Sequence, residues 1–137
     1  GKSETVSTNE VGEIINNISE VVSTNVYGVE IPGTDGRAGM AAIVFNDGIG
    51  SDQIDLGALS QHINENLPSY ARPIFIRVLE QLPTTTTHKL QKNELREQAF
   101  HLDQVEQELL VRDPSTGQYR KLDSDFYDHI MRREIAF

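Results

Sequence analysis

A threonine-rich segment, Pro83–Lys92, holds the residues whose chemistry is easiest to define. It reads P-T-T-T-T-H-K-L-Q-K, so Lys89 and Lys92 follow a run of hydroxyl side chains. A lysine on a polar loop can bring its ammonium group to a phosphate or a carboxylate, and nearby hydroxyls and backbone amides can add hydrogen-bond donors. Lys89 or Lys92 is therefore a candidate stabiliser of negative charge on a substrate. The alternative is a solvated lysine on a threonine-rich loop, and the residues alone favour that alternative.

The other reactive side chains do not form a recognisable catalytic or metal site. The histidines lack the close, paired spacing of metal ligands, and the acidic pairs are better explained as helix caps or solvated faces. Gly48-Ile49-Gly50 lacks the third glycine and the lysine of a phosphate loop, and no nucleophile-elbow motif is present. The residues considered are His62, His88, His101, His129, Glu106/Glu108 and Asp123/Asp125. The chain alone therefore holds no complete active site, and we expect no metal site.

Composition and charge narrow the class of protein. The 137 residues include 12 basic and 21 acidic side chains, a net charge of 12 − 21 = −9, and no cysteine. No run approaches the roughly 18 apolar residues of a membrane span, and without cysteine there is no disulfide or thiolate site. Four basic residues fall close together, Arg72, Arg77, Lys89 and Lys92. This small cluster cannot serve a nucleic acid, which needs a basic face; it fits a single phosphorylated ligand or an accidental grouping equally well.

The elements that position these residues can be read from hydrophobic periodicity and turn residues. Ser7 and Glu10 have the spacing of a capping box, which predicts a helix start. Pro32–Gly36 is a turn between two apolar strands, which predicts an antiparallel hairpin. Asp123-Ser124-Asp125 is expected to cap a final helix. The predicted helices are 8–19, 56–67, 93–100, a weak one through Val105 and one around 126–131; the predicted strands are 22–31, 38–45, 74–79 and a small hairpin over 109–119.

Helices interleaved with at least one hairpin indicate the α+β class. We expect a small antiparallel sheet of about three strands, flanking helices and a C-terminal hairpin–helix extension. The chain is expected to be one domain over residues 1–137, with a core at 1–100 and the extension at 101–137.

Several motifs, in order and with consistent spacing, match one known family over nearly the whole chain. They are Lys2–Val11 (K-S-E-T-V-S-T-N-E-V), Asn25–Val29 (N-V-Y-G-V), Gly36–Ile43 (G-R-A-G-M-A-A-I), Leu67–Pro73 (L-P-S-Y-A-R-P), Phe75–Arg77 (F-I-R) and Thr85–Lys92 (T-T-T-H-K-L-Q-K). The chain thereby resembles the C-terminal domain of the adenylate-forming, or acyl-CoA synthetase, superfamily. It is most similar to the branch of fatty-acid transport proteins, also called very-long-chain acyl-CoA synthetases, and the extension at 101–137 would be specific to that branch.

The resemblance implies a division of labour with an N-terminal domain, which carries the ATP loop, the acyl pocket and the bound Mg²⁺. In that family the small domain supplies one lysine for making acyl-AMP from fatty acid and ATP, and it then rotates and presents a loop during attack by the CoA thiol. By motif position Lys89 is the catalytic lysine, and Lys92 is a candidate phosphate contact. The CoA-facing loop would be Ser3, Glu4, Thr5, Val6 and Ser7.

Four positions depart from the family pattern. Ser3 and Thr86 stand where the branch has glycine, Thr5 where it has asparagine and His88 where it has phenylalanine. These departures keep open an alternative, a catalytically inactive interaction or regulatory module with the same fold. If the chain is part of a synthetase, we expect it to have no ligase activity alone and to need no cofactor of its own. We expect the whole enzyme to be cytoplasmic, with any peripheral contact to a membrane made by the rest of the chain.

Overall fold

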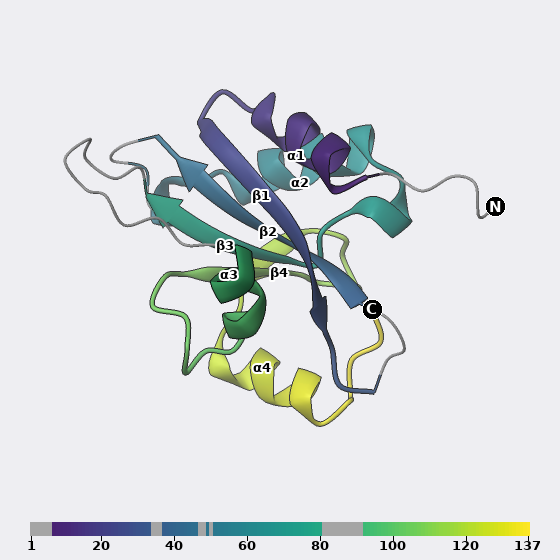
Figure 1. Cartoon of the computed structure of the whole chain (residues 1–137). Coiled ribbons are helices and arrows are strands. Elements are labelled where there is room, and N and C mark those ends of the chain that lie inside the picture. The colour runs from purple at the N-terminus through teal and green to yellow at the C-terminus, as the bar shows by residue number, and fades with distance from the viewer. Residues whose placement is uncertain (1–6, 34–36, 47–48, 50, 81–91) are drawn as a thin grey trace.

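A five-stranded sheet with helices on both faces forms the centre of the molecule (Figure 1). The computed structural model describes residues 7–33, 37–46, 49, 51–80 and 92–137. Figure 1 shows α1 and α2 covering one face of the sheet and α3 and α4 the other. The elements are α1 (Thr8–Asn16), β1 (Val21–Glu30), β2 (Arg37–Phe45), α2 (Leu56–Asn66), β3 (Phe75–Glu80), α3 (Lys92–Gln98), β4 (Leu109–Arg112), β5 (Tyr119–Lys121) and α4 (Ser124–Met131), with short 3-10 turns at Ser51–Gln53 and Ser69–Ala71.

The strand order is β1-β2-β3-β4-β5, and the sheet is mixed. β1 and β2 form the predicted antiparallel hairpin, whereas β2 and β3 run parallel. A parallel pair needs a crossover between its strands, and here α2 supplies it. The α+β class is confirmed, but the expectation of about three antiparallel strands was too low. β4 joins β3 with the partners Phe75↔Val111 and Arg77↔Leu109, so the C-terminal hairpin is part of the main sheet.

Local capping signals explain where several helices begin. Ser7 is the N-cap of α1, where its Oγ accepts a hydrogen bond from the backbone N–H of Glu10 at 3.1 Å. Asp123 is the N-cap of α4, where its carboxylate accepts from the N–H of Phe126 at 2.8 Å. Each cap satisfies a backbone donor that has no partner within the helix. Both predicted caps are therefore confirmed.

Two helix predictions were too long. α1 ends at Asn16 rather than Ser19, because the N–H groups of Asn17 and Ile18 bond to carbonyls three residues back and tighten the last turn. α3 ends at Gln98, and the next residue, Ala99, has φ +44°, a left-handed conformation that stops a helix. The segment through Val105 forms turns, so the weak helix predicted there is wrong.

Hydrophobic side chains fill a layer on each face of the sheet. The layer under α1 and α2 includes Ile15, Ile43, Ile63, Ile76, Leu110 and Tyr119, and the layer under α3 and α4 includes Phe75, Leu95, Phe100, Val111, Phe126 and Ile130. Residues of the 101–137 segment are buried in both layers. That segment is thus integral to the core rather than an appendage. Among the described residues, no helix is long and apolar enough to cross a membrane.

Candidate functional site

The residues expected to act on substrate lie at two places in the chain. Lys89 falls within 81–91, outside the described residues, between the end of β3 at Glu80 and the start of α3 at Lys92. Lys92 is the first residue of α3. Ser3, Glu4, Thr5 and Val6 also lie outside the described residues, whereas Ser7 is fixed as the N-cap of α1. The structure therefore describes the frame around the two predicted loops.

The frame around 81–91 consists of β3 and α3, and aromatic packing joins them. The rings of Phe75 on β3 and Phe100 after α3 are stacked, with centroids 4.2 Å apart. Leu95 of α3 is 2% exposed and belongs to the same core layer. β3 itself lies between β2 and β4. Both ends of the segment that carries Lys89 are thus attached to the well-packed centre of the molecule.

The basic cluster noted in the sequence is divided by the fold. Arg72 donates from Nε to the carbonyl of Leu67 at 2.9 Å and from Nη2 to the carbonyl of Asn64 at 2.9 Å. A cation at this position also complements the negative end of the α2 dipole. Arg72 therefore closes the C-terminal end of a helix.

Arg77 lies inside the molecule, which the sequence analysis did not anticipate. The residue is only 2% exposed, and its Nε and Nη2 both donate to Oε1 of Gln107, at 2.9 and 2.6 Å. Burial lowers its pKa, while Tyr27 and the charges of Glu106 and Glu94 act in the opposite direction. The available signal was alternation: Phe75, Arg77 and Leu79 point to one face of β3, so a central strand would place the arginine over the core.

The described histidines each contact a neighbouring part of the chain. His62 Nε2 lies 2.8 Å from the carbonyl oxygen of Ile14, which joins α2 to α1, and His101 Nδ1 lies 2.8 Å from the hydroxyl of Tyr127. His129 contacts Asp125 and Glu134. Over the described ranges, no group of three side chains could hold a metal ion. His88 lies outside those ranges.

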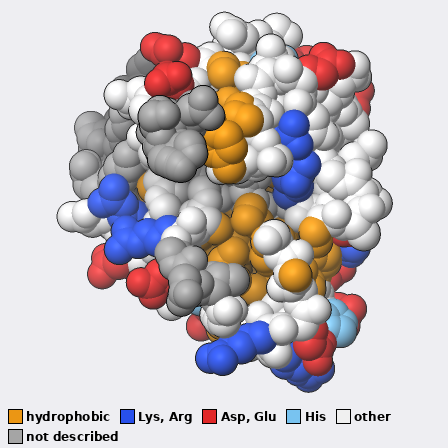
Figure 2. Space-filling model, turned by 90° about the vertical axis from the view of Figure 1, so that its right-hand side faces the viewer, with side chains coloured by type: hydrophobic (Ala, Val, Ile, Leu, Met, Phe, Trp, Pro, Cys, Tyr) orange, Lys and Arg blue, Asp and Glu red, His pale blue; other side chains and the backbone are white. Residues whose placement is uncertain are grey.

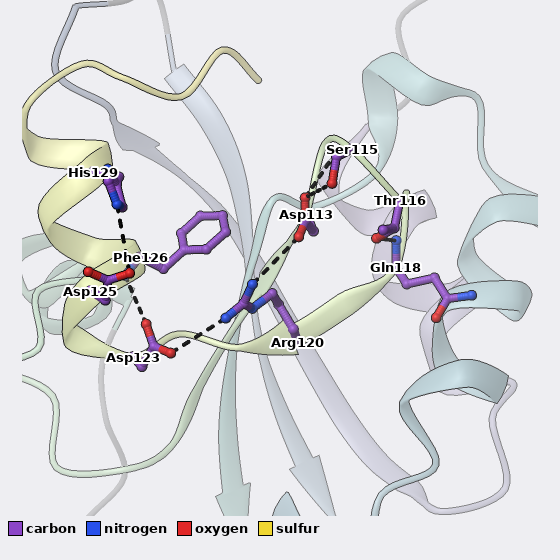
Figure 3. Close-up of polar contacts among 9 residues, drawn as sticks. All are labelled: Asp113, Ser115, Thr116, Gln118, Arg120, Asp123, Asp125, Phe126 and His129. Carbon is purple, nitrogen blue, oxygen red and sulfur yellow. Dashed lines mark hydrogen bonds and ion pairs between the residues drawn. The ribbon is translucent and has the colours of Figure 1, made fainter.

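Polar contacts in the C-terminal segment connect the β4–β5 turn to α4 (Figure 3). Arg120 lies 3.7 Å from Asp113 and 3.5 Å from Asp123, with its guanidinium 5.0 Å from the centre of the Phe126 ring. Hydrogen bonds from the hydroxyl and N–H of Ser115 lower the pKa of Asp113. Asp123 thus caps a helix and pairs with an arginine, as expected for a structural acidic residue.

Hydrophobic side chains gather at the centre of the face shown in Figure 2, with basic side chains on both sides of them. The C-terminal residue Phe137 is 38% exposed, and its ring makes an edge contact with that of Phe75, centroids 5.9 Å apart. Tyr70, in the turn before β3, is 64% exposed. One partly exposed aromatic ring therefore contacts the beginning of β3, and a second exposed ring lies in the turn that precedes this strand.

Comparison with known proteins decides which family this fold represents. The AMP-binding enzyme C-terminal domain family matches residues 10–89, more than half of the chain. The chain belongs to that family. The region of the chain that matches the family ends at Lys89, so it includes the predicted catalytic lysine.

Relatives of this AMP-binding enzyme C-terminal domain are long-chain fatty acid transport proteins. Protein 3 of Homo sapiens is 40% identical over 130 residues, which cover 95% of this chain and 19% of that protein. Protein 1 of Mus musculus is 38% identical over 135 residues, which cover 98% of this chain and 20% of that protein. The chain thus spans about a fifth of the length of these relatives. The solved structure of apo MatB from Rhodopseudomonas palustris is 28% identical with a TM-score of 0.53, covering 67% of this chain and 18% of that one.

Proposed function

We propose that this chain is the mobile C-terminal domain of an ATP-dependent, AMP-forming fatty-acid–CoA ligase specific for long or very long acyl chains. The observation that carries the proposal is the family match over residues 10–89, which reaches Lys89. The similarity to long-chain fatty acid transport proteins over 95% of the chain supports the acyl substrate. The partner would be an N-terminal adenylation domain of the same chain, and the substrates fatty acid, ATP and CoA.

Lys89 is the proposed catalytic residue of the first half-reaction. During adenylation the fatty-acid carboxylate attacks the α-phosphorus of ATP, the bond to pyrophosphate breaks, and negative charge shifts among the phosphate oxygens. An ammonium group held near those oxygens stabilises the transition state more than the ground state. Lys92, three residues later at the start of α3, is proposed to contact phosphate. The ATP phosphates and Mg²⁺ would be bound by the N-terminal domain.

The loop Ser3–Ser7 is proposed to face CoA during the second half-reaction. Ser7 is fixed by its cap on α1, so the loop has one firm end. Ser3 adds a side chain where the branch has glycine, which narrows the approach of the backbone to a ligand. A Ser3→Gly substitution in the full-length protein should leave adenylation unchanged and increase the rate of thioester formation.

The extension at 101–137 is proposed to be specific to the transport-protein branch. The family match ends at residue 89, whereas similarity to the mouse transport protein 1 covers 98% of the chain. Its strands β4 and β5 complete the sheet, which supports one domain over 1–137. The division into a core at 1–100 and an extension at 101–137 is part of the proposal. We place the whole enzyme in the cytoplasm, with any membrane contact made peripherally by its other parts.

Measurement of the two half-reactions in the full-length protein tests the proposal. Lys89→Ala should reduce acyl-adenylate formation by about 100-fold, the usual effect of removing one charge-stabilising donor. Thioester formation from supplied acyl-adenylate and CoA should keep its wild-type rate. The isolated chain should form no AMP from ATP and fatty acid. Equal loss of both half-reactions in Lys89→Ala would overturn the role of Lys89, and a full-length protein without ligase activity would favour the regulatory module.

A further inference from the structure

A charged side chain at the centre of the sheet connects two parts of the chain on either side of the segment 81–91. Arg77 and Gln107 are separated by 30 positions in sequence, yet one side-chain oxygen of Gln107 accepts two hydrogen bonds from the guanidinium. We refer to these two bonds as the Arg77–Gln107 clamp. The backbone bond from the N–H of Val78 to the carbonyl of Glu108, at 2.9 Å, lies next to it. The chain leaves the sheet at the end of β3, forms α3 and returns to the sheet at β4. The clamp thus joins the two ends of this excursion.

Stability alone does not account for an arginine at this position. A buried charge is costly, and well-packed apolar residues are often as stabilising as a buried polar pair. The neighbours of Arg77 in the sheet register, Ala42 and Leu109, are apolar. In addition, Nη1 of Arg77 and the hydroxyl of Tyr27 are both buried without a hydrogen-bond partner among the described residues. Violations of this kind concentrate at sites where geometry matters for function.

The clamp acts on the same structural unit as the aromatic stack. Phe75, two residues before Arg77 on the same face of β3, stacks on Phe100, which follows α3. Gln107 comes seven residues after Phe100, so the stack and the clamp fasten the returning segment to β3 at two successive points. The stack fastens the chain to β3 two residues after the end of α3, and the clamp fastens it again nine residues after that end. The path of the chain that returns from α3 is therefore tied to β3.

We propose that Arg77 is a positioning residue for adenylation and that Gln107 is its partner. The clamp fastens the segment that follows α3 to β3, the strand that leads into the segment with Lys89. Loosening the clamp should therefore slow adenylation although Lys89 is still present in the chain. This inference rests on the proposed function of Lys89.

The test uses substitutions at Gln107 in the full-length protein, because the Gln107 side chain is exposed and its replacement leaves no cavity. Gln107→Leu removes the acceptor, and Gln107→Glu keeps an oxygen that can pair with Arg77. Gln104→Leu is the matched control, an exposed glutamine in the same segment. The rate constant and KM values of acyl-adenylate formation are measured for each, together with thioester formation from supplied acyl-adenylate.

We expect Gln107→Leu to lower the rate constant of adenylation about tenfold, less than the ~100-fold cost of a 1 Å displacement of a reacting group. The KM values for ATP and fatty acid, and the rate of thioester formation, should stay within about twofold of wild type. Gln107→Glu and Gln104→Leu should adenylate at the wild-type rate.

Two results would overturn the proposal. Unchanged adenylation in Gln107→Leu would show that the clamp does not position the site, and an equal decrease in both half-reactions would show a general structural role. Lys89→Ala, measured alongside, separates the catalytic role of Lys89 from the positioning role of Arg77. If that variant adenylates normally, the proposed function itself fails. If it loses adenylation while Gln107→Leu does not, only the positioning role is wrong.

Discussion

The rings of Phe75 and Phe100 lie parallel, with 4.2 Å between their centroids and 4° between their planes. Phe75 is at the start of β3 and Phe100 lies two residues after the end of α3, and neither ring is exposed. This contact holds together the two elements that flank the predicted catalytic segment. The packing of the core and the attachment of the chain on both sides of 81–91 therefore depend on the same pair of residues.

Replacement of Phe100 should be strongly destabilising. Phe100→Ala removes a fully buried ring and should lower the free energy of unfolding by about 3–5 kcal/mol, measured by urea denaturation of the 137-residue chain. Phe137→Ala is the control, since its ring also contacts that of Phe75 but is 38% exposed. The decrease in the free energy of unfolding should be clearly smaller for Phe137→Ala than for Phe100→Ala. Equal losses in the two variants would contradict the central place of the stack.

The hydroxyl of Tyr119 should contribute to stability through a buried hydrogen bond. Tyr119 is 3% exposed and donates to the carbonyl of Pro73, while its backbone N–H donates to Ser60 Oγ at 2.9 Å. Tyr119→Phe leaves that carbonyl unpaired and should cost about 1–2 kcal/mol. Tyr127→Phe, which breaks a less buried bond to His101, should cost less. A reversed order of the two losses, measured by urea denaturation, would refute this account of the hairpin.

His129 should make the stability of the C-terminal helix depend on pH. The hydrogen bond to Glu134 raises the pKa of His129 above 6.5, and the charges of Asp125 and Glu134 act in the same direction. Because the folded-state pKa is the higher one, the stabilisation is fully present below the unfolded-state pKa of about 6.5 and is lost as the pH rises through the folded-state value.

The comparison of wild type with Glu134→Gln tests this prediction. The stability difference between them should be greatest below pH ~6.5 and should shrink as the pH increases. NMR titration of the His129 ring should give a lower pKa in the variant. A difference that instead grows with pH would show that the pair does not act through the protonated imidazole.

Local signals in the sequence were sufficient to predict much of the fold. The capping residues Ser7 and Asp123 and the hairpin around Pro32–Gly36 were found because each depends on residues close together in sequence. The pairing of β4 with β3 could not be found in this way, because periodicity shows that a strand exists and not which edge it joins. The buried position of Arg77 follows from the same long-range pairing and was missed for the same reason.

The candidate site was predictable to a smaller extent. Residue chemistry alone favoured a solvated lysine on the threonine-rich segment, and the family motif was needed to single out Lys89. Arg72 donates hydrogen bonds to the carbonyl oxygens of Leu67 and Asn64. Arg77 donates to Gln107, which is 30 positions away in the sequence. Charge spacing could not distinguish these internal arginines from a ligand-binding cluster.

The central claim is that one lysine of this chain takes part in adenylation, and the most direct measurement compares two lysines three positions apart. The rate of acyl-adenylate formation is measured at saturating ATP and fatty acid in full-length Lys89→Ala and Lys92→Ala. We expect a loss of about 100-fold for Lys89→Ala and a clearly smaller loss for Lys92→Ala, with thioester formation from supplied acyl-adenylate retained in Lys89→Ala. Adenylation at the wild-type rate in Lys89→Ala would contradict the account.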